Sequence, residues 1–444
     1  MMVMQYYKSL DKYKKAFWIY LFLLFIEGSM RKWFMPSLSN AWMICREPIV
    51  IWTVLSLMNT KYLKSIVAKS FMVIGCIMFL TTLTLGHQNV MVALFGFRIW
   101  FLHIPYIFIM SQKLNREDLI RVCQFLMLIF LPMTLLYVAQ WAAPPNSWLN
   151  ARVGGVVAVE AEEGTLRPSG TFILGLGAAY YNPVVVSIFV ACMYSSFYKK
   201  ELMLFKKELL FLAISIVVTL AVSVSRGTVV QSAVCAIVVA LFVALTGKTT
   251  YLKKLLVGFS LIYILFTVAS KVDIGGKNLM APIINRFEVA AEQEGGTSGI
   301  LESRIFEPYK FWNDKGKLLN PPLFGYGIGA GSNYGTQTLK FVSIFGNSKA
   351  WGLGEWSCQI VTNEMGFFFG GIVWALRLGF CAHLFFACYK KLRKNKDLLP
   401  ICLWTLSVPF FGNGNINLTM TLGWIVIVMI LLLTSIKTSE KIKE

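Results

Sequence analysis

Long apolar stretches, separated by short charged segments, dominate the pattern of the chain. An α-helix needs about 20 mostly apolar residues to cross the hydrocarbon core of a bilayer. The stretches predict about twelve membrane-spanning helices, at 16–30, 41–58, 66–85, 91–110, 119–141, 172–196, 207–224, 228–246, 252–270, 361–389, 398–411 and 416–436.

Some of these spans have individual features. The spans at 16–30 and 41–58 are short, and we expect them to be broken or tilted. The spans at 207–224 and 228–246 are nearly contiguous and predict a helical hairpin. The first span runs into Glu27 without a small-residue cleavage site, which predicts a retained helix rather than a cleaved signal peptide.

The composition supports a membrane protein. Apolar residues make up 57% of the chain and charged residues 14%, whereas soluble domains carry about 25% charged residues. Most of the nine cysteines lie inside apolar spans, and only Cys358 falls in the large loop. This distribution predicts neither a disulfide framework nor a cysteine metal site.

Basic residues alternate along the chain. Lysine and arginine gather near 8–15, 61–69, 113–121, 199–207, 248–254, 390–396 and 437–443, whereas the alternate loops at 86–90 and 412–417 carry none. Cytoplasmic loops carry such an excess of basic residues. The net charge of +20 is therefore read as the positive-inside pattern rather than as a nucleic-acid surface, and both termini are predicted to be cytoplasmic.

Two outer connections are long, at 142–171 and 271–360. A structureless loop of the second length would be unusual, so we expect a small folded cap with a surface helix near 302–314. The predicted fold is an all-α polytopic membrane protein with a large extracytoplasmic loop between helices 9 and 10. Its parts are helices 1–9 in 1–270, the loop in 271–360 and helices 10–12 in 361–444.

Charged residues at the outer ends of the spans are candidates for function, because ionisable groups are costly inside a bilayer. Glu27 and Arg31 are four residues apart and can pair on one helical face, either as a helix-end ion pair or as substrate contacts. Arg98 either snorkels to the interface or faces a cavity. Arg226 lies in the predicted hairpin turn, either idle in solvent or placed to grip a lipid phosphate.

The large loop and the start of the following helix add Arg304, Glu355 and Glu364, with a glycine-rich segment between them. This segment, 325–331, lacks the strand and helix that flank a dinucleotide site. We interpret it as flexible backbone that another group can approach closely. None of the three histidines lies in the large loop, and no HExxH, Walker A or GxSxG motif occurs. The remaining arginines and carboxylates suit a phosphate-bearing substrate with a carboxylate as general base.

The layout resembles the O-antigen ligase and O-antigen polymerase family of membrane glycosyltransferases. The similar features are the hairpin turn 225–227 (SRG), a late outer loop containing Arg304, segment 322–329 (PLFGYGIG) and helix entry 363–366 (NEMG). Segments that resemble the polymerase-like branch are 27–33 (EGSMRKW) with Pro36, 46–48 (REP), 96–98 (GFR) and 167–172 (RPSGTF).

The resemblance implies transfer of a glycan from polyprenyl diphosphate on the outer face of the bacterial inner membrane. Arg226 and Arg304 would bind the diphosphate, with Arg31, Arg98 and Arg167 as further candidates. The family's ligases place a histidine after the glycine-rich segment, where this chain has Glu355. This departure favours a polymerase-like reaction in which Glu355 takes the acceptor proton and Glu364 is the second candidate.

The expected reaction needs no metal or cofactor, because arginines can neutralise the leaving diphosphate, and a single displacement predicts inversion. The expected partners are the lipid-linked glycan, the bilayer and a candidate chain-length regulator, without nucleic acid. Two alternatives stay open. A ligase would transfer the glycan to lipid A core or another acceptor. A lipid-linked oligosaccharide flippase also fits twelve helices, although transporters usually show internal repeats and midplane sites, and no repeat is visible here.

Overall fold

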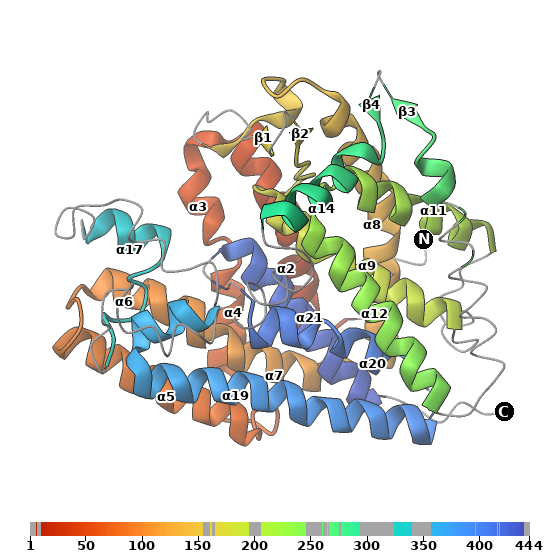
Figure 1. Ribbon diagram of the computed structural model, residues 1–444. Helices are drawn as coiled ribbons and strands as arrows, with labels where there is room; N and C mark the ends of the chain where they lie inside the picture. Colours follow the sequence, from red (N-terminus) through yellow and green to blue (C-terminus); the bar gives the residue numbers. More distant parts are fainter. Residues whose placement is uncertain are drawn as a thin grey trace.

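The computed structural model describes residues 6, 10–153, 160–161, 165–194, 206–245, 260, 264, 266–274, 277–293, 324–339, 357–395, 397–414, 416 and 418–438. These parts are almost entirely helical (Figure 1). Two short antiparallel strand pairs accompany the helices. They are β1 (Glu160–Ala161) with β2 (Thr165–Leu166), and β3 (Asp273–Ile274) with β4 (Lys277–Asn278).

Seven of the described helices are long and apolar enough to cross a membrane, which indicates a membrane protein. They are Ile66–Thr84, Val90–Lys113, Arg116–Ala142, Gly175–Met193, Arg226–Leu245, Ile360–Asn395 and Thr419–Thr438. Two shorter apolar helices are Glu208–Val222 and Leu399–Gly412. The predicted span 252–270 lies largely outside the described residues, and the number twelve remains a prediction.

The two spans expected to be short or broken are so in the structure. Helix α2 (Lys12–Ser29) begins after Asp11, whose carboxylate accepts from the backbone of Tyr13 and Lys14. It continues into a π-helical turn, η1 (Met30–Phe34). The next span is divided into η2 (Pro36–Leu38), α3 (Ser39–Met43) and α4 (Glu47–Leu57).

Two more π-helical turns interrupt apolar helices within the described residues. The turn η3 (Arg98–Leu102) joins α6 (Val90–Phe97) to α7 (His103–Lys113). The turn η7 (Val408–Gly412) follows α20 (Leu399–Trp404). Single π-helical turns inside helices occur frequently at functional sites, so these positions direct attention to their side chains.

Helix α21 (Thr419–Thr438) lies in the middle of the bundle, and most of its residues are buried. It packs against α7, α8 (Arg116–Ala142) and α9 (Gly175–Tyr194). Its Trp424 stacks on Tyr181 of α9 with ring centroids 4.9 Å apart. Phe25 and Phe172 meet the same indole edge-on at 5.4 and 5.9 Å. This aromatic cluster forms the core between the C-terminal end of α2 and α21.

The predicted hairpin consists of α11 (Lys206–Val222) and α12 (Arg226–Leu245), joined by the short turn 223–225. The two helices have different neighbours, because α11 packs mainly on α8 and α12 mainly on α9. Helix α14 (Ala281–Gln293), from the predicted loop 271–360, contacts both of them and crosses the upper end of α12 (Figure 1). The surface helix expected at 302–314 lies outside the described residues.

The remaining helices complete the second side of the bundle. Helix α19 (Ser357–Asn395) packs against α5 (Ile66–Thr84), and α17 (Asn333–Thr338) lies beside α6. The C-terminal ends of α7 and α21, which the charge pattern predicts on one side of the membrane, are in contact. Lys437 of α21 donates to the carbonyls of Ser111, Gln112 and Leu114. At the opposite ends, Lys32 donates to the carbonyl of Gly170 over 2.7 Å.

Candidate functional site

The glycine-rich segment, residues 325–331, lies directly on α19 where this helix is kinked at Gly366. We call residues 363–366 the entry of α19, because the long second part of the helix begins there. The backbone N–H of Tyr326 donates to the carbonyl of Asn363, and that of Gly327 donates to the carbonyl of Glu364, each over 2.9 Å. Two sequence motifs that are more than 30 residues apart therefore form one backbone unit, which confirms the expectation of close approach.

Glycine is required along this segment by both backbone angles and space. Gly325, Gly327 and Gly329 have φ values of +76°, +105° and +86°, and Gly366 of the helix entry has +74°. Residues with a Cβ rarely adopt this left-handed region. A Cβ on Gly325 would also overlap the backbone of 364–366, and one on Gly329 would overlap the carbonyl of Val92.

The carboxylate of Glu364 accepts hydrogen bonds from the backbone of the glycine-rich segment. Its Oε2 accepts from the backbone N–H of Gly329 over 2.9 Å and from Nε1 of Trp100 over 2.6 Å. Its Oε1 accepts from the backbone N–H of Gly331 over 2.8 Å. The residue is only 1% exposed. Three donors on a buried carboxylate suit a positioning role, whereas a general base must reach a substrate proton.

The turn after α5, which contains His87, also forms hydrogen bonds with the glycine-rich segment. The backbone N–H of His87 donates to the carbonyl of Tyr326 over 3.0 Å, and Thr82 Oγ1 accepts from the N–H of Ile328 over 3.0 Å. The imidazole of His87 uses both nitrogens: Nδ1 accepts from the N–H of Asn89, which leaves Nε2 to donate to the carbonyl of Ile328 over 3.1 Å. Burial lowers the pKa of His87 below its usual value.

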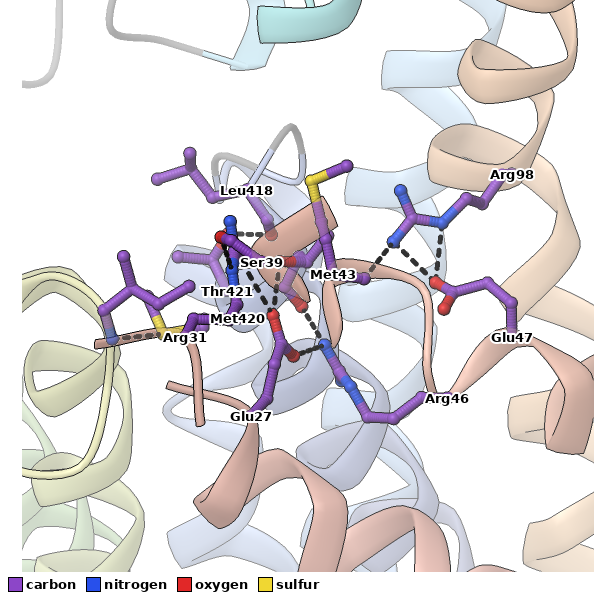
Figure 2. A network of polar contacts seen from close by, with 12 residues as sticks. Glu27, Arg31, Ser39, Met43, Arg46, Glu47, Arg98, Leu418, Met420 and Thr421 are labelled. Carbon is purple, nitrogen blue, oxygen red and sulfur yellow. Dashed lines mark hydrogen bonds and ion pairs between the residues drawn. The ribbon is translucent and has the colours of Figure 1, made fainter. Parts of the chain in front are cut away.

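A second set of polar contacts lies at the C-terminal end of α2 (Figure 2). Glu27 is fully buried and pairs with Arg31 over 3.1 Å and with Arg46 over 2.9 Å. Thr419 donates from its hydroxyl to Glu27, and its carbonyl accepts from Arg46 over 2.6 Å. Gly423 makes room for this arginine, because a Cβ there would overlap the guanidinium. The predicted Glu27–Arg31 pair is confirmed.

Arg98 forms the neighbouring pair. It approaches Oε1 of Glu47 with Nε at 2.6 Å and Nη2 at 2.5 Å, and it also donates to the carbonyl of Met43 over 3.3 Å (Figure 2). Both side chains are at least nine-tenths buried. The burial of Arg98 contradicts the snorkelling interpretation. Arg98 holds η3 against the start of α4.

The two sets of contacts are joined through neighbouring residues. Arg46 and Glu47 are adjacent in sequence and pair with different helices. Arg98 and Trp100 share η3, and Trp100 leads to Glu364. Separate buried polar contacts, linked through these neighbouring residues of the chain, thus run from the end of α2 to the glycine-rich segment. Gly96, at the end of α6, lies directly against the backbone of residues 328–329, so α6 also contacts the glycine-rich segment.

Arg226 occupies a different position. It is the first residue of α12, it is half-buried, and the hydroxyl of Ser225 accepts from the N–H of Thr228 in the same turn. Among the described residues, a Cβ on Gly227 would meet nothing within 4 Å, so the first turn of α12 has free space beside Arg226. Arg167 is exposed in the segment between β2 and α9. Arg304 and Glu355 lie outside the described residues.

No family model, curated protein or solved structure matches the chain. The chemistry of the site therefore rests on the geometry of its own residues.

The structure adds residues that the list of sequence candidates did not contain. Arg46 and Glu47 were seen only as part of a short motif, and Trp100 carried no signal beyond an apolar span. Arg377, in the middle of α19, donates from Nε to the carbonyl of Phe411 over 2.6 Å and lies over the ring of Trp100 at 5.6 Å. A charge within a long apolar span was the available signal for Arg377, since such residues are rarely placed there without a partner.

Proposed function

We propose that the protein is a membrane glycosyltransferase that joins polyprenyl-diphosphate-linked oligosaccharide units on the outer face of a bacterial inner membrane. The observation that carries this proposal is the contact between the glycine-rich segment and the entry of α19 at Glu364. These are two of the motifs through which the sequence resembles the O-antigen ligase and polymerase family. Their contact supports a common role for them in one site.

The proposal includes about twelve spans with both termini in the cytoplasm. The grouping of the helix ends supports this arrangement, because basic segments predicted on one side meet at Lys14 with Asp118 and at Arg116 with Asp397. The large loop would then lie outside.

Arg226 is assigned to the diphosphate. Helix α14 of the large loop packs on α11 and α12. Within α14, Ile283 is 4% exposed, and Arg286 is three residues further on the same helical face. This face is therefore directed toward the hairpin that carries Arg226. This packing supports a role of the loop beside Arg226, and the proposal adds Arg304 and Glu355 from the same loop.

The reaction is a single displacement at the anomeric carbon of the donor sugar. The acceptor hydroxyl forms the new glycosidic bond and gives its proton to Glu355, while the bond to the polyprenyl diphosphate breaks with its electron pair on the diphosphate oxygen. Arg226 and Arg304 stabilise the charge that develops on the leaving group, which is commonly the largest catalytic contribution. The anomeric configuration inverts, and no metal is needed for charge neutralisation.

The other candidate residues take supporting positions in this proposal. Glu364 holds the glycine-rich segment, and Glu355 stays the proposed base, because three N–H donors already occupy the oxygens of Glu364. Arg31 and Arg98 are engaged by Glu27 and Glu47. In the proposal, these two arginines hold the helices around the site in place, and they are not the primary diphosphate ligands.

The test is the lipid-linked glycan of a strain that lacks this protein and is complemented with variants. Accumulation of single repeat units is expected. Arg226→Ala and Glu355→Gln should fail to restore polymer while remaining in the membrane. Arg393→Ala, an exposed arginine near the end of α19, is the matched control and should restore it. Full-length polymer from Arg226→Ala would reject its assigned role.

A ligase would use the same donor and differ in the acceptor. The same strain separates the two reactions, because loss of a ligase leaves full polymer on the lipid carrier, whereas loss of a polymerase leaves single units.

A flippase for lipid-linked oligosaccharide is a second candidate function. It is favoured by one observation, the three π-helical interruptions next to buried charges at Arg31, Arg98 and Arg377. Transporters commonly bind substrate at interrupted helices. An assay of the purified protein in liposomes that contain the lipid-linked repeat unit distinguishes the glycosyltransferase from the flippase. Longer glycans without any other protein support the transferase, whereas movement of unchanged substrate across the bilayer supports the flippase.

A further inference from the structure

We propose that the protein binds the headgroup of an anionic phospholipid at a row of alternating lysine and aromatic side chains. The row consists of Lys12, Tyr13, Lys113, Tyr62 and Lys61, and we call it the lysine–aromatic row. It lies at the opposite ends of the helices from Glu364 and Glu27. The inference is independent of the glycosyltransferase proposal.

The row is built from three separate parts of the chain. The ammonium group of Lys113, at the end of α7, lies 4.8 Å from the ring centroid of Tyr13 and 4.6 Å from that of Tyr62. Lys12 lies 5.2 Å from the ring of Tyr13, and Lys61 lies 5.7 Å from the ring of Tyr62. Cation–π contacts are formed within about 6 Å. The row therefore joins the start of α2, the segment after α4 and the end of α7.

Carboxylates neutralise the row only in part. Asp11 approaches Lys113 at 3.5 Å. In contrast, neither Lys12 nor Lys61 has a carboxylate within 4 Å in the part of the chain that the structure describes. Both are exposed. Lys14, in contrast, forms an ion pair with Asp118 at 2.6 Å, and its side chain is only 15% exposed.

An apolar surface for acyl chains adjoins the row. Trp52 of α4 stacks on Tyr13 with centroids 4.9 Å apart and an interplanar angle of 22°. It is 40% exposed, and Ile51 and Leu55 beside it are 43% and 67% exposed. In a helix that lies in a bilayer, tryptophan marks the headgroup level and exposed aliphatic side chains face the hydrocarbon. Headgroup and acyl contacts are thus continuous on this face.

The charge of the row selects the headgroup. Three lysines against one aspartate attract a phosphate. The ammonium group of phosphatidylethanolamine would find the aromatic rings already covered by Lys12, Lys113 and Lys61. Basic pockets between membrane helices bind anionic lipid headgroups in this way. We therefore assign the site to a phospholipid with net negative charge, with phosphatidylglycerol as the probe.

The experiment titrates the full chain in detergent with phosphatidylglycerol or phosphatidylethanolamine and measures bound lipid by native mass spectrometry. Phosphatidylglycerol should bind more tightly. The double variant Lys12→Ala with Lys61→Ala should weaken it roughly 30-fold, since each lysine near an anionic surface contributes about a factor of five. Lys12→Arg with Lys61→Arg should retain binding, because the charge is kept.

The matched control removes two lysines elsewhere. Lys390→Ala with Lys391→Ala, near the end of α19, changes the net charge equally and should leave the affinity unchanged. If the alanine double variant does not fold, Lys12→Gln with Lys61→Gln keeps the side-chain stems over the rings and replaces it. Equal binding of both lipids, or an equal loss in the control, would overturn the proposal.

Discussion

Trp100 donates from Nε1 to Oε2 of Glu364 over 2.6 Å, and this hydrogen bond joins the π-helical turn η3 to the entry of α19. The same oxygen accepts from Gly329 of the glycine-rich segment. One carboxylate therefore connects three segments that are distant in sequence. The geometry explains why an acidic residue can stand inside an apolar span, because a buried carboxylate needs several donors.

Replacement of Trp100 by phenylalanine should destabilise the protein. The substitution removes one donor from a buried carboxylate, and hydrogen bonds to charged groups contribute about 1.5–3 kcal/mol. Unfolding in detergent measures the change. Trp404→Phe is the matched control, because its Nε1 donates to the neutral carbonyl of Cys381 over 2.8 Å. A loss in Trp100→Phe that is no larger than in the control would contradict the assigned importance of Glu364.

Gly329→Ala should disrupt the glycine-rich segment. The residue has a φ of +86°, and a Cβ would overlap the carbonyl of Val92. We expect a loss of more than about 3 kcal/mol or failure to fold. Gly379→Ala in α19 is the control, because a Cβ there meets nothing within 4 Å. It should gain about 0.5–1 kcal/mol from helix propensity. Similar stability of the two variants would show that the segment does not require this glycine.

Arg98 and Glu47 should behave as one unit. Arg98→Met leaves a buried carboxylate without its main partner, and Glu47→Met leaves a buried guanidinium, so each should cost about 3–5 kcal/mol. The double variant should cost clearly less than the two losses combined, because no charge is left unpaired. A double-mutant cycle in detergent measures this coupling. Additive losses would mean that the observed 2.5 Å contact contributes nothing to stability.

His87 should make the anchoring of the glycine-rich segment sensitive to acid. Its pKa is lowered in the folded protein because of burial. Protonation also displaces the N–H of Asn89, which donates to Nδ1. The folded state therefore binds fewer protons than the unfolded state, so the stability that neutral His87 contributes is lost as the pH falls below about 6.5.

The measurement compares the unfolding of the natural protein and His87→Gln between pH 7.5 and pH 5. The variant should be less stable at pH 7.5, and its stability should change less across this range. A pH dependence that the substitution leaves unaltered would assign the effect to other groups.

The apolar pattern predicted the helices well because the bilayer fixes their length. The span predicted at 66–85 is Ile66–Thr84, and that at 416–436 is Thr419–Thr438. It did not reveal the π-helical turns such as Arg98–Leu102. An apolar span looks the same in sequence whether one turn is α-helical or π-helical, because only the backbone hydrogen bonds differ.

Pairing of charges was predictable only where it was local. The spacing of Glu27 and Arg31 indicated their contact, because residues four apart share a helical face. Nothing in the spacing indicated that Arg46 would join Glu27 or that Glu47 would take Arg98. Arg31 and Arg98 therefore stood as candidates for the diphosphate until their buried partners were visible.

The sequence alone indicated the membrane character, the positions of most helices and a close approach of the backbone in the glycine-rich segment. These follow from local properties: the length of apolar runs, the clustering of lysine and the missing Cβ. Only the tertiary structure decided what Glu364 does. The donors on its carboxylate come from Trp100, Gly329 and Gly331. Their distances from it depend on how the helices pack, which no local pattern encodes.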